Sequence, residues 1–186
     1  MKKMIRLSAI LALVLGSLSC SKLGLMFGET EFEYDSELAA AYYCGSSSED
    51  GSHAFRLILL SGRTDENFEL LSPGAKASLL LNAPVQNSGT LPEGYYGAGN
   101  GYGIAVGGTA DSKEPGTSEA SFVELKRFGD DEAQCYPVEN GTVEVELESN
   151  GHYEIVAKFR AAGYQFEFEY EGPLDTYSYD VEGLDL

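Results

Sequence analysis

Side chains that act as nucleophiles and bases are few in this chain, which has three cysteines and two histidines. A thiol of Cys44 or Cys135 beside the imidazole of His53 or His152 would make an activated nucleophile. However, His53 lies at a loop edge and His152 begins the polar face of a strand, so we do not expect such a pair. The chain also has no Gly-x-Ser-x-Gly elbow and no His-Glu-x-x-His motif. The sequence therefore predicts a protein that is not an enzyme.

Cys44 and Cys135 are the two cysteines outside the N-terminal segment. In an exported protein an even pair favours a disulfide, which here would close a loop of about ninety residues and stabilise the fold by ~2–4 kcal/mol. Two buried thiols are the alternative, because nothing in the sequence shows that the strands carrying the cysteines are neighbours. Both interpretations stay open.

Two other patterns resemble binding motifs without meeting their requirements. The glycine run from Gly97 to Gly108 lacks the Gly-Lys-Ser/Thr step and the following helix of a phosphate-binding loop, so we expect bends and bulges between strands. Acidic residues cluster in a turn at 130–132 and in the C-terminal tail, at Asp175, Asp180, Glu182 and Asp185. Carboxylates bind Ca²⁺, but neither cluster has an ordered ligand spacing. Solvated turns are therefore favoured, and we expect no metal and no cofactor.

Aromatic residues offer another mode of binding, because the chain has twelve tyrosines and nine phenylalanines but no tryptophan. Most of these rings must fill the core. A tyrosine on a loop can stack on a sugar or contact a protein, since its ring is apolar and its hydroxyl forms hydrogen bonds. The candidates for ligand stacking are Tyr95, Tyr96 and Tyr102, with Tyr177 or Tyr179 in the tail. Thirty acidic residues make any pair of carboxylates uninformative about a glycosidase site.

The elements that position these residues are clearest from Gly141 to Pro173, where three antiparallel strands alternate apolar and charged side chains. One face of this sheet is apolar and the other is acidic. The apolar faces match only if Leu147 lies opposite Tyr153. That register leaves residues 149–151 as the first loop and places Gly151 where the left-handed conformation is needed.

The second turn of this meander is less determined by the pattern. Pairing Phe159 with Tyr164 or with Phe166 keeps the apolar face intact in either case. We prefer the second register, because it sets Lys158 opposite Glu167 and so pairs opposite charges.

Short strands also account for the rest of the chain. They are expected at 39–44, 54–60, 75–81, 102–106, 120–128 and 134–138, with a short one after the turn at 91–94. Helix is the competing interpretation only at 39–44, because of its alanines, and Tyr42-Tyr43 favours a strand there. A loop at 139–141 leads into the meander. The sequence therefore predicts an all-β fold, an antiparallel meander forming a barrel or a barrel-like sandwich of about 8–10 strands, and we prefer the barrel.

Residues 1–20 have the features of a targeting segment. A basic start precedes a short apolar run from Leu7 to Leu15, and small residues lead into Cys20. This pattern resembles a bacterial lipoprotein signal, in which Cys20 is lipidated and becomes the first residue of the mature protein. An ordinary cleaved signal is the alternative, because Ser17 stands where an aliphatic residue is usual.

The remaining organisation follows from this anchor. Residues 21–37 are expected to be a tether reaching ~20–25 Å, part of which can add an edge strand because Phe32 and Tyr34 alternate with acids. Residues 38–174 suffice for a single β domain with one core. Residues 175–186 are an acidic tail or a final edge strand. An acylated cysteine with two or three chains would hold the protein stably on the membrane.

The charge of the chain restricts its partners. The net charge is −18, and without the targeting segment nine basic residues face thirty acidic ones, a net −21. This charge argues against nucleic acid and against adsorption to anionic lipid heads. The register of the first turn also sets Glu146 opposite Glu154, a like-charge pair suited only to a solvated face.

Several short motifs lie along the chain between Ala41 and Leu174. They are Ala41-Tyr42-Tyr43, Leu91-Pro92-Glu93-Gly94-Tyr95, Tyr136-Pro137-Val138, Gly141-Thr142-Val143, Gly151-His152-Tyr153-Glu154-Ile155 and Tyr170-Glu171-Gly172-Pro173-Leu174. In these motifs the chain resembles small lipoproteins of gut Bacteroidetes. The resemblance implies an envelope location and an all-β fold, and it implies no catalytic residues. Cys44 departs from that family, in which glycine is expected.

Together these features predict a non-catalytic protein that is lipid-anchored to the outer membrane, on its periplasmic or cell-surface side, and binds a glycan or an envelope partner protein. The alternatives are a barrel that carries a small apolar ligand and, less favoured, a hydrolase. An open lumen would support the carrier, exposed tyrosines the glycan-binding protein, and a cleft with two facing carboxylates the hydrolase.

Overall fold

Apolar and polar side chains alternate along most of the chain, and the computed structural model has strands at these positions. It describes residues 31–46, 52–66, 68–84, 90–97, 103–106 and 121–178. Their strands are β1 (Glu31–Asp35), β2 (Leu38–Ser46), β3 (Ser52–Ser61), β4 (Gly74–Pro84), β5 (Gly94–Tyr96), β6 (Gly103–Ile104), β7 (Phe122–Lys126), β8 (Gln134–Leu147), β9 (Tyr153–Ala161), β10 (Tyr164–Gly172) and β11 (Asp175–Ser178). The targeting segment lies outside the described residues. Within them, no helix has the length and apolar composition that a membrane span requires.

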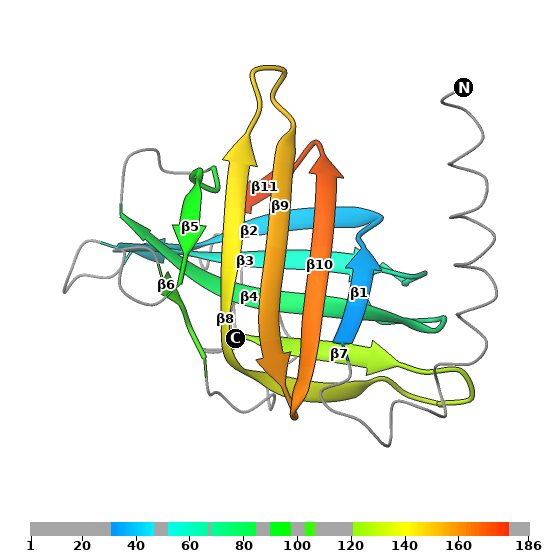
Figure 1. The fold of residues 1–186 in the computed structure, drawn as a ribbon. Helices are drawn as coiled ribbons and strands as arrows, with labels where there is room; N and C mark the ends of the chain where they lie inside the picture. The colour runs from blue at the N-terminus through cyan, green and yellow to red at the C-terminus, as the bar shows by residue number, and fades with distance from the viewer. Residues whose placement is uncertain are drawn as a thin grey trace, which may run out of the picture. The chain divides into compact units, whose positions relative to one another are not determined.

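The strands form one sheet in the order β1-β10-β9-β8-β7-β4-β3-β2-β11, with β5 on β8 and β6 on β4. Most neighbours are antiparallel, but β11 pairs with β2 in parallel, and β1 runs in the same direction as β10 (Figure 1). The all-β expectation is confirmed. The preferred barrel is wrong, because the sheet ends at β1 and β11 instead of closing. The described residues form eleven strands rather than 8–10, since both edge strands that the sequence left as alternatives do form.

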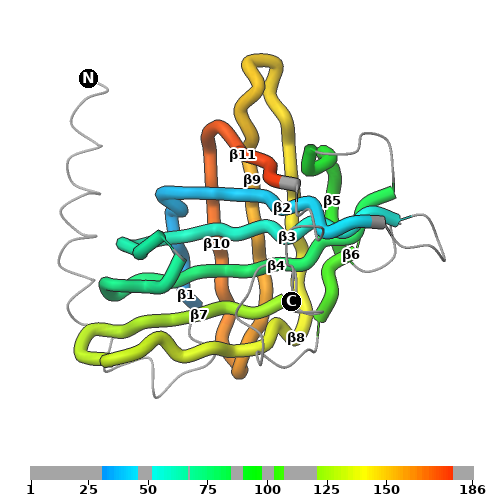
Figure 2. The backbone as a smooth tube through the Cα atoms, turned by 180° about the vertical axis from the view of Figure 1, so that it is seen from behind, coloured from blue at the N-terminus to red at the C-terminus, as the bar shows by residue number. Residues whose placement is uncertain are grey.

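The sheet folds over on itself into two layers (Figures 1 and 2). We call β1, β10, β9, β5 and the second half of β8 the front layer, and β2, β3, β4, β7, β11, β6 and the first half of β8 the back layer. The strands of the front layer run across those of the back layer. Strands that change layer through a bend or bulge are typical of such crossed packing.

Strand β8 makes one of these corners. Its first residues pair with β7 and its later residues pair with β9, and the register shifts between Val138 and Asn140. The sequence predicted a loop at 139–141, whereas the structure has one continuous strand with Glu139 as the extra residue of a bulge. A bulge bends a strand without ending its pairing, which explains the difference.

The chain makes a second corner between β1 and β2. The amide of Ser36 donates to the carbonyl oxygen of Glu169 in the front layer at 2.7 Å, and the next amide, of Glu37, donates to Leu60 in the back layer at 2.8 Å. The expected edge strand around Phe32 and Tyr34 is therefore confirmed, and the tether interpretation is wrong for residues 31–35.

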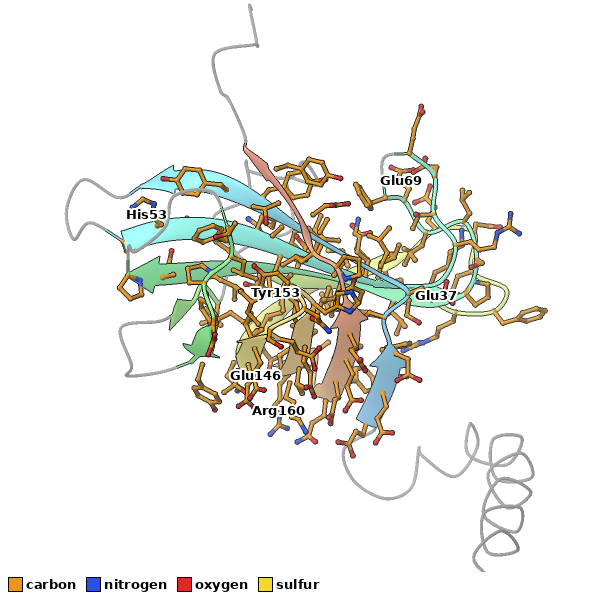
Figure 3. The ribbon with its side chains drawn as sticks, turned by 90° about the horizontal axis from the view of Figure 1, so that it is seen from above. Glu37, His53, Glu69, Glu146, Tyr153 and Arg160 are labelled. Carbon is orange, nitrogen blue, oxygen red and sulfur yellow. The ribbon has the colours of Figure 1, made fainter. Side chains whose placement is uncertain are left out.

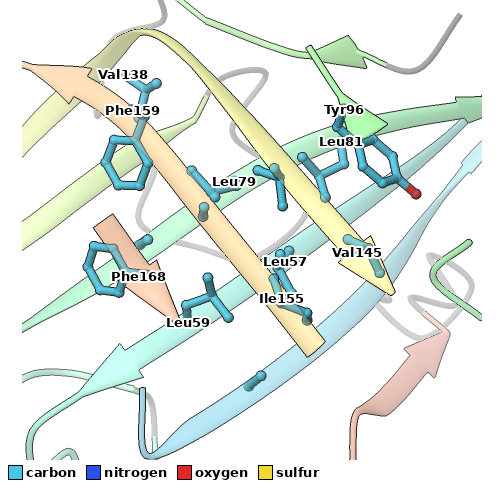
Figure 4. Close-up of a cluster of buried hydrophobic side chains, with 14 of the residues drawn as sticks. Leu57, Leu59, Leu79, Leu81, Tyr96, Val138, Val145, Ile155, Phe159 and Phe168 are labelled. Atoms are coloured by element: carbon cyan, nitrogen blue, oxygen red, sulfur yellow. The ribbon is translucent and has the colours of Figure 1, made fainter. Parts of the chain in front are cut away.

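The core lies between the layers, where apolar faces of both meet (Figure 4). Leucines of β3 and β4 pack against aliphatic and aromatic side chains of β8, β9 and β10. The residues involved include Leu57, Leu59, Leu79, Leu81, Val145, Ile155, Phe159 and Phe168, each no more than 3% exposed. The ring of Phe159 stacks on those of Phe166 and Phe168, with centroids 5.6 Å and 5.8 Å apart. This packing fixes the inward face of the meander, and therefore also its outward face.

Both registers predicted for the meander are confirmed. Leu147 lies opposite Tyr153, and Gly151 has a φ of 84° in the loop between them. In the second turn Phe166 is the partner of Phe159, as preferred. The two-residue turn at 162–163 has positive φ at both positions, 51° and 77°, as a type I′ hairpin turn requires.

Candidate functional site

The outer surface of the front layer carries a dense set of carboxylates, which we call the acidic face. Its members alternate with core residues along β1, β8, β9 and β10 and therefore point away from the back layer. They are Glu33, Asp35, Glu144, Glu146, Glu154, Glu167, Glu169 and Glu171. Two basic side chains, Lys158 and Arg160, share this surface. Figure 3 shows Glu146 and Arg160 directed outward from the front layer.

Strand register brings three of these glutamates into one row. Glu154 lies opposite Glu146 on one neighbouring strand and opposite Glu171 on the other. Side chains directly opposite on one face are about 5 Å apart at Cβ, and like charges in such pairs are destabilising. The sequence predicted the pair of Glu146 with Glu154, and the structure adds Glu171.

The basic side chains neutralise only part of the face. Lys158 Nζ lies 2.7 Å from Glu167 Oε1, with the lysine side chain 59% exposed and the glutamate 19%. An exposed pair of this kind contributes about 0–1 kcal/mol. The predicted pairing of Lys158 with Glu167 is confirmed, and the row of three glutamates lies beside it.

Two surface depressions of about 300 Å³ each lie along β1 and β10 and share Asp35 and Glu169. Tyr34 lines the first depression and Tyr170 the second. Burial raises the pKa of Tyr34, against the opposing effect of the Arg127 charge, and burial followed by the nearby Asp175 raises the pKa of Tyr170. Both phenols therefore stay protonated near neutral pH and can donate hydrogen bonds.

The predicted stacking tyrosines do not form one platform. Tyr95 is 46% exposed and pairs with Glu144 at the border of the acidic face. Tyr96 is fully buried, and its hydroxyl donates to the carbonyl oxygen of Pro92 at 2.6 Å. The stacking role of Tyr96 is therefore wrong, because alternation along β5 sends its ring into the core. Tyr102 lies outside the described residues.

In the tail, Tyr177 is 48% exposed and stacks on Tyr42, with ring centroids 5.2 Å apart. Its strand, β11, lies at the edge of the back layer, next to β2. Tyr179 lies outside the described residues, as do Asp180, Glu182 and Asp185.

The cysteines do not bond to each other. Cys44 is on β2 and Cys135 on β8, and three strands lie between them, which corresponds to about 19 Å across the sheet. The disulfide alternative is therefore wrong for this fold, because β3, β4 and β7 separate the two strands that carry the cysteines. Cys20, the predicted lipidation site, lies outside the described residues.

Cys44 and His53 each interact with a tyrosine instead of with each other. The Cys44 thiol donates to the Tyr42 carbonyl oxygen at 3.4 Å, and burial raises its pKa despite the charge and backbone amide of Arg56. His53 stacks on Tyr43, and the Tyr43 hydroxyl is hydrogen-bonded to its Nδ1 at 2.7 Å. His152 is exposed beside the first hairpin loop. A protonated thiol with no contacting imidazole is a weak nucleophile.

Three buried charged side chains of the back layer were not singled out from the sequence. Arg56, inside an apolar strand, is 1% exposed, and its Nη1 donates to Ser78 Oγ at 3.5 Å. Lys76 and Glu124 form an ion pair of 2.8 Å with side chains only 8% and 6% exposed. A charged residue interrupting an apolar or alternating run was the only signal available.

The other predicted clusters have structural roles or no defined ligands. The Asp130 carboxylate accepts the amide of Arg127 at 3.0 Å, which makes it a turn cap. Part of the glycine run forms β6, and the rest lies mainly outside the described residues. Among the described residues, no group of three or more histidine, cysteine or acidic side chains is arranged to hold a metal ion.

Comparisons with family models, with curated proteins and with solved structures found no match for this chain.

Proposed function

We propose that this protein is a non-catalytic lipoprotein of the outer membrane whose acidic face binds a basic surface of another envelope protein. The observation that carries the proposal is the row of Glu146, Glu154 and Glu171 across three adjacent strands. Like charges directly opposite lower the stability of a sheet. A basic partner would remove that repulsion and gain from the same charges, so the row favours a binding role.

The anchor and the family are part of the same proposal. The basic start, the short apolar run and the small residues before Cys20 support lipidation at that cysteine. The motifs shared with small Bacteroidetes lipoproteins support an envelope location. The net charge of the mature chain argues against nucleic acid as the partner.

Glycan binding is the second candidate, favoured by the half-exposed ring of Tyr95 beside Glu144. Carboxylates and an aromatic ring together are suited to sugar hydroxyls and sugar faces. A glycan array probed with the full chain and with Tyr95→Ala tests it, since loss of signal in the variant supports stacking. A carrier has less support, because the space between the layers is filled by side chains such as Leu57 and Phe168.

The proposed function is tested by isothermal titration calorimetry, in which a peptide rich in lysine and arginine is titrated into the protein. A variant with Glu146, Glu154 and Glu171 changed to glutamine removes the row. At about 0.5 kcal/mol for each exposed ion pair, we expect affinity to fall about tenfold. Affinity should also fall as salt rises.

The matched control changes Glu66, Glu69 and Glu132, three exposed loop residues, to glutamine and so alters the net charge equally. It should bind as the unmodified protein does. Equal weakening of both variants would show that only the overall charge matters, and the proposal would then be wrong.

A further inference from the structure

The two most exposed large apolar side chains of the described residues are Phe128, 95% exposed, and Leu71, 59% exposed. Phe128 lies in the turn between β7 and β8, and Leu71 in the loop between β3 and β4. Isolated apolar side chains are common on protein surfaces, whereas grouped ones mark contact sites. These two side chains mark a contact site only if they lie together.

Lys126 ties the two loops to each other. Its Nζ donates to the carbonyl oxygen of Leu70 at 3.1 Å and to that of Asp131 at 3.1 Å. Leu71 and Phe128 thus project from one end of the molecule, which we call the turn end and define as residues 62–66, 68–73 and 127–133. Figure 3 places Glu69 of this end on the opposite side from His53.

Local hydrogen bonds hold both tips in place. The amide of Leu71 donates to the carbonyl oxygen of Arg63 at 2.8 Å, and Asp130 closes the other turn through hydrogen bonds with Arg127. The apolar side chains are therefore presented by ordered turns, so their exposure is built into the fold. Ordering them on binding would cost little conformational entropy.

The charges of the turn end suit a zwitterionic lipid surface. Arg63 and Arg127 are exposed next to the two apolar side chains, and Asp131 and Glu132 are exposed beside them. Guanidinium groups pair with lipid phosphates, and carboxylates pair with the ammonium of phosphatidylethanolamine. An aromatic ring flanked by charged groups is a common anchor at the boundary between lipid heads and acyl chains.

The first of the described strands, β1, borders the turn end. Strand β1 lies at the same side of the molecule as the turns between β3 and β4 and between β7 and β8 (Figures 1 and 2). Arg127 is close enough to Tyr34 of β1 to lower its pKa, against the larger effect of burial. From Cys20 to β1 there are residues 21–30, which span at most about 35 Å when extended and roughly 17–19 Å when flexible.

We propose that the turn end rests on the membrane, with Phe128 and Leu71 inserted among the head groups of a phosphatidylethanolamine-rich leaflet. This inference rests on the proposed lipid anchor, since a short tether is what brings this end to the lipid. It leaves the acidic face, which lies on the front layer, in solvent.

The absence of tryptophan from the chain provides a direct test. Phe128→Trp introduces a single tryptophan at the tip, and Leu71→Trp does so on the second loop. The full lipidated chain is reconstituted into zwitterionic vesicles of phosphatidylethanolamine and phosphatidylcholine with brominated acyl chains, which quench tryptophan on contact. Tyr95→Trp, at a half-exposed site on the other layer, is the matched control.

We expect blue-shifted and quenched emission from the Phe128→Trp and Leu71→Trp proteins and unquenched emission from the Tyr95→Trp protein. If the protein floats with the vesicles but neither tip probe is quenched, the contact is refuted and the anchor stands. Equal quenching at all three positions also refutes it. If the unmodified chain does not float with vesicles, both the anchor and the contact are wrong.

Discussion

At the level of single residues, the buried ion pair of Lys76 and Glu124 matters for the stability of the fold. Lys76 Nζ also donates to the carbonyl oxygen of Phe68 at 3.2 Å, so the pair connects β4 and β7 to the loop above them. Glu124 Oε1 is buried without a hydrogen-bond partner among the described residues. Replacing both partners of a buried ion pair with apolar residues can leave the stability unchanged. Removing only one partner leaves the other charge buried and unpaired, which is destabilising.

We therefore expect Glu124→Ala to lower the free energy of unfolding by about 3–5 kcal/mol, because it leaves the Lys76 ammonium buried and uncompensated. Urea denaturation followed by circular dichroism measures the change. Glu132→Ala, at an exposed position of the neighbouring turn, should stay within about 0.5 kcal/mol of the parent. Similar values for the two variants would show that the buried pair has no special role.

Three half-buried phenols and the Cys44 thiol are expected to lower the stability of the protein at alkaline pH. Burial raises the pKa of Tyr34, Tyr42 and Tyr170 above the ordinary 10.0 and that of Cys44 above 9.0. As pH rises past these ordinary values, the unfolded chain releases protons that the folded chain still holds. Fewer protons bound by the unfolded state means that the free energy of unfolding falls with rising pH.

The expected result is a stability that these groups leave unchanged below about pH 8 and that declines from about pH 9 upward. Urea denaturation at about pH 7.5 and about pH 10.5 measures it. Tyr34→Phe should show a smaller decline, because it removes one of the penalised ionisations. A stability that is equal or higher at the alkaline pH would contradict this account.

At the scale of elements, the corner in β8 depends on one glycine. A Cβ on Gly141 would lie 2.4 Å from the Cβ of Phe159 and 2.7 Å from the carbonyl oxygen of Lys158, so it cannot be accommodated without moving backbone. This close approach lets β8 pack against β9 immediately after the bulge at Glu139.

Gly141→Ala is accordingly expected to destabilise the protein by about 1–3 kcal/mol or more, as overpacking in a core does. Gly103→Ala is the control, since the nearest atoms to its added Cβ are 3.8 Å away, an ordinary contact. Thermal and urea denaturation of both proteins measure the difference. An unchanged Gly141→Ala protein would mean that the corner tolerates a side chain.

The elements show which features of the fold the sequence determines. Alternation over 141–173 predicted three strands and both registers, because each apolar face must meet the core without a slip. It did not predict the continuity of β8, since a bulge at Glu139 has no distinctive residue pattern. The parallel pairing of β11 with β2 depends on contacts between residues distant in sequence, which local patterns do not encode.

The candidate site was predicted only in part for the same reason. The acidic side of the meander followed from alternation, and so did the pairing of Glu146 with Glu154. The two depressions along β1 and β10 were not predicted, because no local pattern shows that Glu33 and Asp35 lie next to β10. The exposure of Tyr95 and the burial of Tyr96 required the orientation of β5.

For the whole molecule, the open sheet separates two kinds of surface. The acidic face covers the outside of the front layer, whereas the exposed apolar tips and two arginines lie at the turn end. With the proposed anchor, one surface would meet lipid and the other a basic partner. Both proposals depend on the direction of side chains. Alternation along the front-layer strands places carboxylates outward, and the turns expose Phe128 and Leu71.

Carbodiimide cross-linking shows where on the protein a basic partner binds. The reagent joins carboxylates to lysines in direct contact, so the full chain is cross-linked to a lysine-rich peptide and the linked residues are identified by mass spectrometry. We expect links concentrated at Glu146, Glu154 and Glu171, and lost when salt screens the attraction. Links confined to the loop carboxylates near residues 65–69 and 130–132 would contradict the account.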